Sequence, residues 1–437
     1  MAPKLPRGLV IAAPHSNSGK TIFTMGLAAA LSTRGMDVKV AKGGPGFIDP
    51  QFLGLATQTD CFSLDKWAMG TTQLCARARE LGTGTDLLVI EGMMGMYDGA
   101  ASTDGSTANI AETLGLPVIL VVNASGQAQS IAALVHGFAT FQDKPGVAGV
   151  VAVQTGSARH GELLGEALAQ TPIPYLGAIP RSPDLVVPSR HLGLVQALEH
   201  KAPAELVAAA RQAVLDHIDL ETVRSIAAPL PTTAAPKRLP PLGQRIAVAR
   251  DEAFAFAYPH QLLDWRSQGA DLVFVSPLAD QAVPSDCDAV FLPGGYPELH
   301  GRTLAGAERF RESLQAAATR RALIYGECGG YMVLGRGLID KAGIQHKMAG
   351  LLDHVTSFAA SKMHLGYRQL SPVKPAFWTT PLSGHEFHYS RLVESGADAP
   401  LFHQRDARGQ DLGLTGGQRG SVMGSYAHII DQAPIRA

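Results

Sequence analysis

Short runs of β-branched residues alternate with longer Ala- and Leu-rich segments through the first half of this chain. The clearest of the intervening helices is expected at Thr21–Arg34, and a further short strand is expected just before Ile179–Arg181. The other expected strands lie at Leu9–Ala13, Val38–Lys42, Leu87–Glu91, Val118–Asn123 and Val147–Val153. Strands and helices that alternate in this way are typical of an open parallel sheet covered on both faces. The pattern therefore predicts a doubly wound α/β domain.

A Pro-rich segment interrupts this alternation. Residues Ala227–Pro241 read AAPLPTTAAPKRLPP, and their five prolines rule out a continuous helix. A second α/β pattern follows, with strands expected at Ile246–Ala249, Leu272–Val275, Ala289–Leu292 and Ala322–Tyr325. A length of 437 residues also suggests more than one domain. We predict two doubly wound domains, residues 1–226 and 244–437, joined by a linker at 227–243.

Composition excludes several classes of protein. Hydrophobic residues make up 46% of the chain and charged residues 17%, which is typical of a compact globular protein. The formal net charge of −1 provides no overall field for nucleic acid or an anionic membrane. The first apolar run breaks at Pro14, and no apolar stretch reaches the roughly 18 residues of a membrane helix. We therefore expect a cytoplasmic protein that binds neither nucleic acid nor membranes.

The segment APHSNSGKT, Ala13–Thr21, indicates a phosphate-binding loop between the first strand and the first helix. In such loops the backbone N–H groups, a lysine and a hydroxyl surround phosphate oxygens and magnesium. The usual pattern has glycine where this chain has Pro14, so the strict motif fails and a chance GKT at a helix start remains the alternative. The ATP-binding residues predicted here are Ser16, Ser18, Gly19, Lys20 and Thr21.

Two carboxylates lie where they could hold magnesium beside this loop. Glu91 ends an expected strand, and Asp49 lies in the loop that follows Lys42. With Thr21, they provide the oxygen ligands that hydrated magnesium prefers, although each could instead cap a helix or pair with a lysine. The glycine- and methionine-rich run EGMMGMYDG, Glu91–Gly99, suits a loop that approaches a bulky apolar ligand, with Asp98 as its polar point.

The second half contains a cysteine elbow. In IYGECGGYM, Cys328 follows an apolar strand and precedes a short helix, an arrangement that presents a nucleophile and is expected to favour the thiolate. His428 is the expected base. Backbone N–H groups of Gly294, Gly295 and Gly329 are expected to form an oxyanion hole. The other three cysteines, Cys61, Cys75 and Cys287, are expected to be buried hydrophobic residues, because their spacing fits neither a metal site nor a disulfide framework.

His385 and His388 flank Glu386 in GHEFHYS. Their spacing could suggest a zinc site, but no further ligand set accompanies them in the sequence. Contact with a substrate carboxylate or structural hydrogen bonding is the preferred interpretation.

Six motifs together resemble one family: SGKT, FIDP at Phe47–Pro50, EGMMGMYDG, LPGGYPELH, GECGGYM and GHEFHYS. The chain is similar, over nearly its whole length, to glutamine-dependent cobyrinic or hydrogenobyrinic acid a,c-diamide synthases of cobalamin biosynthesis. This resemblance implies an N-terminal P-loop NTPase-like domain similar to dethiobiotin synthetase. It also implies a C-terminal class I glutamine amidotransferase domain with a flavodoxin-like fold.

The resemblance also implies partners and roles. ATP, with Mg²⁺ as its cofactor, would activate a corrin carboxylate as an acyl phosphate, and L-glutamine would supply ammonia through a thioester on Cys328, with His428 as acid and base. The implied contacts are Thr21, Asp49 and Glu91 for magnesium and Phe47, Ile48 and Asp98 for the corrin. A homodimer is allowed. Whether the ring contains cobalt stays open, with a slight preference for a metal-free ring.

Three departures from the family pattern stand out. Gly46 replaces an aspartate that relatives commonly have, and Val153 replaces an asparagine expected to bind adenine. His428 is followed by Ile429 and Ile430 rather than by the usual His-x-Glu, so a Cys-His dyad is expected. The alternatives are a cobyric acid synthase, a nickel-sirohydrochlorin a,c-diamide synthase, or a ParA-like ATPase switch joined to an inactive glutaminase-like domain.

Overall fold

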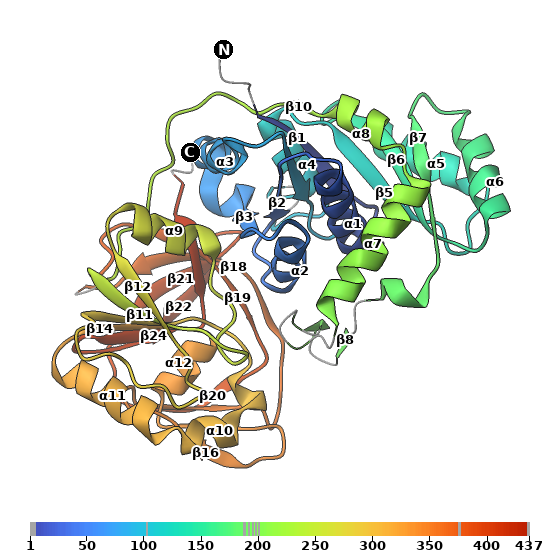
Figure 1. The fold of residues 1–437 in the computed structure, drawn as a ribbon. Coiled ribbons are helices and arrows are strands. Elements are labelled where there is room, and N and C mark those ends of the chain that lie inside the picture. Colours follow the sequence, from blue (N-terminus) through green and yellow to red (C-terminus); the bar gives the residue numbers. More distant parts are fainter. Residues whose placement is uncertain are drawn as a thin grey trace. The chain divides into compact units, whose positions relative to one another are not determined.

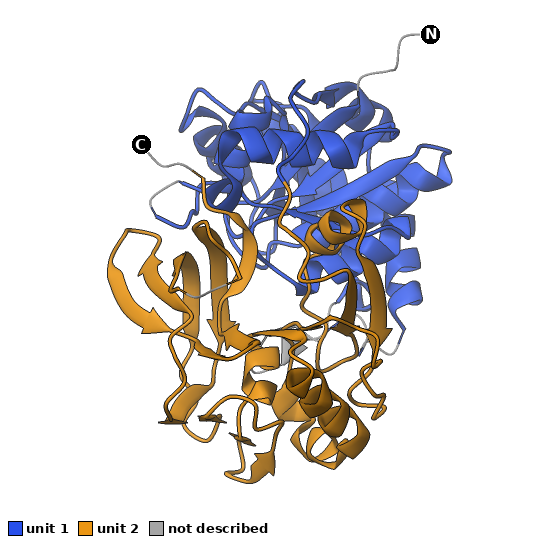
Figure 2. Ribbon diagram, turned by 90° about the vertical axis from the view of Figure 1, so that its left-hand side faces the viewer, with its two compact units in different colours: residues 1–237 blue, residues 238–437 orange. Residues whose placement is uncertain are grey.

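The computed structural model describes residues 6–101, 104–186, 189–190, 193–194, 196, 199, 202–374 and 377–434. The chain divides into two compact units, residues 1–237 and residues 238–437, coloured blue and orange in Figure 2. The division falls inside the Pro-rich segment. Each unit has its own sheet and hydrophobic core, so the two are described separately.

Unit 1 contains an eight-stranded sheet in the order β3-β2-β4-β1-β5-β6-β7, with β10 beside β1 (Figure 1). The seven ordered strands are parallel to their neighbours, and β10 is antiparallel to β1. The strands are β1 Arg7–Ala12, β2 Val38–Gly43, β3 Phe62–Leu64, β4 Leu87–Glu91, β5 Val118–Asn123, β6 Val147–Thr155, β7 Tyr175–Pro180 and β10 Ala228–Pro229. The doubly wound prediction is confirmed. Strand β7 extends through Ile179 and Pro180, which had been expected to follow it, and β3 was missed.

The helices of unit 1 cover both faces of this sheet (Figure 1). They are α1 Lys20–Thr33, α2 Ile48–Thr57, α3 Lys66–Gly82, α4 Thr107–Leu114, α5 Ser130–Thr140, α6 Ala158–Leu168, α7 Pro203–His217 and α8 Leu220–Ile226. The Ala- and Leu-rich helix α1 packs closely against α7. A Cβ at Gly26 of α1 would lie 2.4 Å from the Ala210 carbonyl oxygen, so only glycine allows this approach. Between α6 and α7 lie a short 3-10 helix, Pro183–Leu185, and two short strands, β8 Ser189–Arg190 and β9 Gly193–Leu194.

Unit 2 contains a six-stranded sheet in the order β12-β11-β13-β14-β24-β23. Its strands are β11 Arg245–Ala249, β12 Asp271–Val275, β13 Ala289–Leu292, β14 Leu323–Glu327, β23 Gly417–Arg419 and β24 Val422–Ser425. All are parallel except β23, which pairs antiparallel with β24. The accompanying helices are α9 Pro259–Ser267, 3-10 helix Pro297–Leu299, α10 Gly301–Gly306, α11 Glu308–Thr319 and α12 Gly329–Leu334. All four strands predicted for this half belong to this sheet.

Two further sheets complete unit 2, and neither was predicted. A five-stranded antiparallel sheet has the order β22-β21-β18-β19-β25, with β18 His364–Pro372, β19 Leu382–His388, β21 Phe402–Asp406, β22 Asp411–Thr415 and β25 His428–Gln432. A four-stranded sheet has the order β16-β15-β17-β20, with β15 Gly337–Ile339, β16 Gln345–Lys347, β17 His354–Ser357 and β20 Arg391–Ser395. The flavodoxin-like description therefore covers only the parallel part of the unit.

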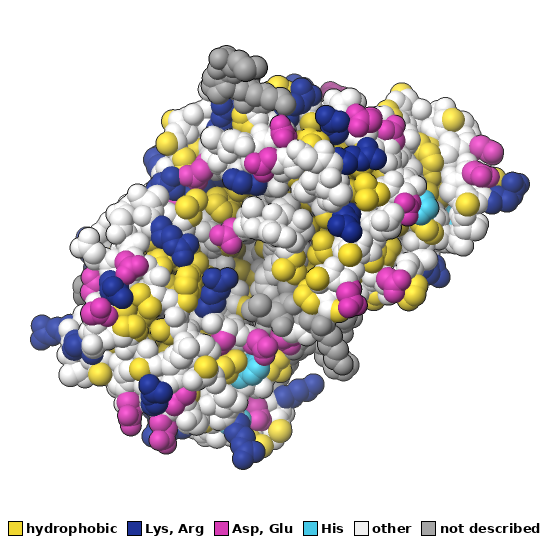
Figure 3. All heavy atoms as spheres, in the orientation of Figure 1, with side chains coloured by type: hydrophobic (Ala, Val, Ile, Leu, Met, Phe, Trp, Pro, Cys, Tyr) yellow, Lys and Arg dark blue, Asp and Glu magenta, His cyan; other side chains and the backbone are white. Residues whose placement is uncertain are grey.

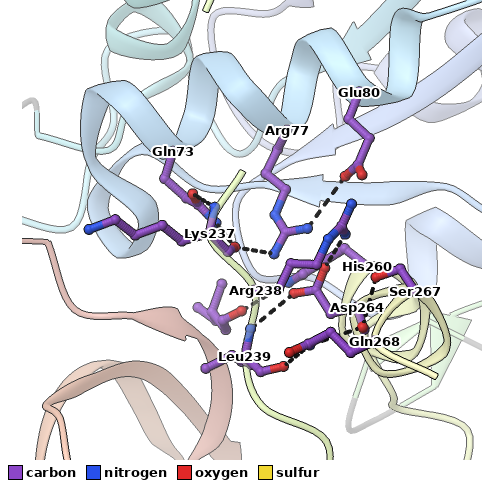
Figure 4. Close-up of polar contacts among 11 residues, drawn as sticks. Gln73, Arg77, Glu80, Lys237, Arg238, Leu239, His260, Asp264, Ser267 and Gln268 are labelled. Atoms are coloured by element: carbon purple, nitrogen blue, oxygen red, sulfur yellow. Dashed lines mark hydrogen bonds and ion pairs between the residues drawn. The ribbon is translucent and has the colours of Figure 1, made fainter. Parts of the chain in front are cut away.

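The Pro-rich segment is held by specific polar contacts on each side of the division (Figure 4). In unit 1, the Gln73 side chain of α3 exchanges hydrogen bonds with the Lys237 backbone at 2.7 and 2.9 Å, and Arg77 donates to the same carbonyl oxygen. In unit 2, Arg238 forms an ion pair of 2.7 Å with the buried carboxylate of Asp264 on α9. These contacts fix each end of the division to its own unit.

On the face shown in Figure 3, acidic and basic side chains are interspersed. Within the described part of the chain, no helix combines the length and apolarity that crossing a bilayer requires.

Candidate active sites

The phosphate-loop residues lie between β1 and α1, at the carboxyl end of the central strand of the unit 1 sheet. Asn17 and Gly19 adopt positive φ angles of 60° and 84°, which bend the backbone into a tight loop before Lys20 starts α1. The Ser18 hydroxyl donates to the His15 carbonyl oxygen at 2.8 Å, while Ser16 is exposed on the loop. Such a loop presents backbone N–H groups at a helix N-terminus, as anion binding requires.

Lys20 points across this loop. Its Nζ donates to the carbonyl oxygens of Met94 at 2.6 Å and His15 at 3.4 Å. Burial, with repulsion from Lys42 as the next cause, lowers the pKa of Lys20 to about 8. A phosphate group bound at the loop would stabilise the charged form of Lys20 and raise its pKa.

The three predicted magnesium ligands meet around a lysine that sequence reasoning did not include. Lys42 Nζ lies 2.6 Å from both Asp49 Oδ2 and Glu91 Oε1, and the Thr21 hydroxyl donates to Glu91 Oε1 at 3.0 Å. Glu91 is fully buried, and burial raises its pKa although Lys42 opposes that change. Lys42 is the penultimate residue of β2 and pairs with Glu91 in the parallel register of β2 and β4. Its place at the end of an expected strand was the available signal in the sequence.

The donors around Lys42 fit a hydrated magnesium ion in kind. A hydroxyl and two carboxylates offer hard oxygen ligands, and Glu91 Oε2 is a buried oxygen that makes no hydrogen bond to the described residues. Lys42 supplies the positive charge between these carboxylates in this structure.

The predicted corrin contacts lie on the loops beside this cluster. Phe47 and Ile48, at the start of α2, are half-buried. Asp98 is exposed, and its Oδ2 accepts a hydrogen bond of 2.8 Å from the Gly95 backbone N–H, which closes its own loop. Met94 in that loop is also exposed and has a positive φ of 48°. These residues offer apolar surface and one carboxylate near the phosphate loop.

Gly46 and Val153, the two positions of unit 1 that depart from the family pattern, have different surroundings. A Cβ added at Gly46 would meet no atom within 4 Å, so the position has room for a side chain. The side chain of Val153, near the end of β6, lies against the phosphate loop, because a Cβ at Gly19 would be 3.1 Å from Val153 Cγ2. Val153 therefore fills space behind the loop.

In unit 2, Cys328 forms a sharp turn between β14 and α12. Its φ of 48° and ψ of −105° are strained for a residue with a side chain. A Cβ at Gly330 would lie 1.9 Å from the Leu292 carbonyl oxygen, so the helix approaches β13 only because this residue is glycine. Strained turns of this kind expose a nucleophile at the end of a parallel sheet.

The surroundings of Cys328 do not favour the expected thiolate. Burial raises the pKa of the Cys328 thiol, the negative charge of Glu298 adds to the effect, and a hydrogen bond from the Gly329 backbone N–H opposes it. The thiol instead donates to the Phe387 carbonyl oxygen, with 3.9 Å between Sγ and O. Helix α12 has only six residues, so its N-terminus does not overcome desolvation. Cys328 therefore needs a base.

The other residues predicted for this site lie around the thiol. A Cβ at Gly294 would be 2.3 Å from His428 Cε1 and 3.1 Å from Cys328 Cβ, so Gly294 lies close to both the base and the nucleophile. A Cβ at Gly329 would lie 3.0 Å from the Gly295 nitrogen. The fold thus gathers all five predicted residues of the cysteine site, which come from three separate stretches of sequence.

A buried carboxylate also reaches this site. Glu327 Oε2 lies 3.6 Å from His428 Nδ1, and Glu327 Oε1 accepts a hydrogen bond of 3.0 Å from the Ile429 backbone N–H. The expected Cys-His dyad did not include it. Its position directly before Cys328 in the sequence was the available signal.

His385 and His388 lie on β19 next to the site. Burial lowers the pKa of each imidazole to about 3. His388 stacks on Tyr426 with ring centroids 3.8 Å apart, and His364 lies on its other side at 4.8 Å. No group of three or more His, Cys, Asp or Glu side chains converges as a metal site within the described ranges.

Comparison with known proteins assigns each unit to a domain family. Residues 9–195 match the CobQ/CobB/MinD/ParA nucleotide binding domain, and residues 245–434 match the CobB/CobQ-like glutamine amidotransferase domain. Curated relatives match almost the entire chain. Proteins from Brucella abortus and a Sinorhizobium species are each 49% identical over 429 residues, covering 97% and 98% of this chain and 98% and 99% of their own.

A protein from Rhodobacter capsulatus is 46% identical over 432 residues, covering 97% of this chain and 99% of its own. All three relatives are named hydrogenobyrinate a,c-diamide synthase. The two matched domains confirm the pair of domain types expected from the motifs. The chain belongs to the hydrogenobyrinate a,c-diamide synthase family.

Proposed function

We propose that this enzyme amidates the a and c side-chain carboxylates of hydrogenobyrinic acid, using ATP for activation and glutamine as the source of ammonia. The observation that carries the proposal is the cysteine site of unit 2, where Cys328, His428 and Gly294 meet in a family whose members share the whole length of the chain. The cluster around Lys42 in unit 1 supports the activation step.

In unit 1, the N–H groups of the phosphate loop and the ammonium of Lys20 hold the ATP phosphates. A substrate carboxylate attacks the γ-phosphorus, the bond to ADP breaks, and an acyl phosphate forms. Ammonia then displaces inorganic phosphate and leaves the amide. The residues act by positioning and by neutralising charge, which provide most of the catalysis in phosphoryl transfer.

Thr21, Asp49 and Glu91 are the residues that would hold magnesium. The ion, when bound with ATP, supplies positive charge to the phosphates. Lys42 lies 2.6 Å from each of the two carboxylates and adds a further positive charge beside them.

In unit 2, His428 accepts the Cys328 proton as the sulfur attacks the glutamine side-chain amide. The tetrahedral oxyanion is stabilised by N–H groups of Gly294, Gly295 and Gly329. Protonation of the leaving nitrogen by His428 releases ammonia and leaves a thioester, which water hydrolyses to glutamate. Because burial raises the pKa of the Cys328 thiol, the reaction needs this base.

The corrin is proposed to contact Phe47, Ile48 and Asp98. The names of the relatives favour the metal-free ring over cobyrinic acid, and they favour the diamide enzyme over a cobyric acid or nickel-sirohydrochlorin enzyme. A ParA-like switch with an inactive second domain is disfavoured by the assembled cysteine site. The proposed domain limits, 1–226 and 244–437 around a linker, and the proposed homodimer can be tested by limited proteolysis and sedimentation.

Mass spectrometry provides the test. Hydrogenobyrinic and cobyrinic acid are incubated separately with protein, Mg-ATP and glutamine, and two amidations of the metal-free ring are expected. Cys328→Ala should abolish amidation from glutamine but not from ammonium salts. Cys287→Ala removes another buried thiol of unit 2 and should keep both activities. Amidation from glutamine by the folded Cys328→Ala protein, or no product from either ring with ammonia, would contradict the proposal.

A further inference from the structure

The carboxylate of Glu327 lies directly behind the histidine of the cysteine site. Glu327 ends β14, its side chain is 1% exposed, and its Oε2 is 3.6 Å from His428 Nδ1. We infer that Glu327 is a positioning residue for glutamine hydrolysis: it orients the His428 ring and stabilises the imidazolium that forms when Cys328 loses its proton. This inference rests on the proposed glutaminase function and adds a third member to the expected pair.

The two oxygens of Glu327 have separate partners. Oε1 accepts the hydrogen bond from the Ile429 N–H at 3.0 Å, which fixes the carboxylate relative to the first residues of β25. Oε2 is thereby directed at the Nδ1 of the preceding residue, His428. A distance of 3.6 Å exceeds an ordinary hydrogen bond, but catalytic contacts are often long before substrate binds.

This arrangement requires a particular tautomer. If Nδ1 carries the proton toward Glu327, the Nε2 lone pair is left for the Cys328 thiol. The same division of roles holds a histidine in the Ser-His-Asp triad, and it recurs on unrelated folds with different chain orders. Here the carboxylate of Glu327 directly precedes the nucleophile in the sequence. The position two residues after His428, where a glutamate is usual, is Ile430.

Other titratable groups around His428 do not replace this carboxylate. His385 pairs with His428 in the β19–β25 register, and His388 lies on the same strand. Burial lowers the pKa of both to about 3, so both rings are neutral at physiological pH. Cys328 is the proton donor itself. Glu327 therefore supplies negative charge at Nδ1.

A purely structural role for Glu327 is the alternative, since its Oε1 also holds the Ile429 backbone. Glu327→Gln separates the two roles because the amide oxygen still accepts from Ile429 N–H while the charge is lost. Asp264→Asn is the matched control. Asp264 is a second buried carboxylate of unit 2, and its partners include Arg238 at 2.7 Å and the Leu239 backbone N–H at 3.3 Å.

The experiment measures glutaminase kcat and KM of the full chain from pH 5 to 10. For Glu327→Gln we expect kcat to fall between about 10²- and 10⁴-fold, as when a triad carboxylate is lost, with KM within about threefold. The acidic limb of the profile should move to lower pH, because the protonated base is no longer stabilised, and Glu327→Asp should recover part of kcat. Ammonia-dependent amidation by Glu327→Gln and the acidic limb of Asp264→Asn should match the wild type.

A wild-type measurement keeps the inference testable if Glu327→Gln does not fold. Nitrogen-15 NMR of labelled histidine, with His428 assigned by its absence in His428→Asn, should show the proton on Nδ1. A proton on Nε2, or a Glu327→Gln enzyme with wild-type kcat and pH profile, would overturn the inference. Absence of glutamine hydrolysis in the wild type would instead remove the proposed function, and the tautomer would still report on Glu327.

Discussion

Replacing Lys42 by methionine should destabilise unit 1 severely. The ammonium lies 2.6 Å from each of two carboxylates, and Glu91 is fully buried. At an effective dielectric constant of about 20, unit charges at this distance attract by about 6 kcal/mol, a gain that desolvation partly offsets. Breaking a buried pair by removing one partner typically costs about 3–5 kcal/mol, because the remaining charge stays buried. We expect that loss for Lys42→Met.

The loss of stability in Lys42→Met should increase as pH rises. Burial already raises the pKa of Glu91 in the folded state, and removal of Lys42 takes away the main opposing influence. A carboxyl group with a raised folded-state pKa binds its proton more tightly when folded, so stability falls as pH rises through that pKa. Lys42→Met should therefore be least destabilised in acid and most destabilised well above pH 4.5, the ordinary value for this group.

Differential scanning calorimetry at pH 5 and pH 8 provides the measurement. For a unit of this size, each kcal/mol shifts Tm by roughly 2–4 °C, so a fall of about 6–20 °C in the unit 1 transition is expected. Lys39→Met is the control, because Lys39 lies on the same strand but is only half-buried. A shift at pH 8 no larger than that of Lys39→Met would refute the argument that Lys42 neutralises a buried carboxylate.

Three further outcomes follow from the structure. Bound phosphates should raise the pKa of Lys20 from about 8, so nucleotide binding near pH 8 should take up a proton. Calorimetric titration in buffers of different ionisation enthalpy measures this proton uptake. Gly330→Ala should destabilise unit 2 by about 3 kcal/mol or more in urea unfolding, whereas Gly306→Ala, in open space, should be neutral. Burial lowers the pKa of His354 to about 4 and of His385 to about 3 in the folded state. The stability of unit 2 should therefore fall as pH drops below about 6.5, and an unchanged Tm between pH 7 and 5 would contradict this.

Sequence patterns predicted the parallel sheets well, because buried parallel strands are short, apolar and β-branched. The nine elements expected as strands at definite ranges all lie in those two sheets. The two smaller sheets of unit 2, one antiparallel and one mixed, were missed. The strand His364–Pro372 is partly exposed and Arg391–Ser395 is exposed along its length, so no apolar run marks them.

Some site residues could be predicted from the sequence and others could not. Residues in strand-loop-helix turns, such as Lys20 and Cys328, could be found because the local backbone carries the chemistry. Lys42 and Glu327 were missed because their roles depend on partners that are distant in sequence, 49 and 101 positions away. The thiolate expectation failed for a related reason, since desolvation by the surrounding fold outweighed a local helix effect.

The protonated state of Cys328 has a consequence for the lifetime of the enzyme. Peroxides oxidise the thiolate far faster than the thiol, and exposure increases the rate. Cys328 is only 3% exposed, and its thiol donates to the Phe387 carbonyl oxygen. The burial that raises the pKa of this nucleophile should therefore also slow its oxidation to sulfenic acid.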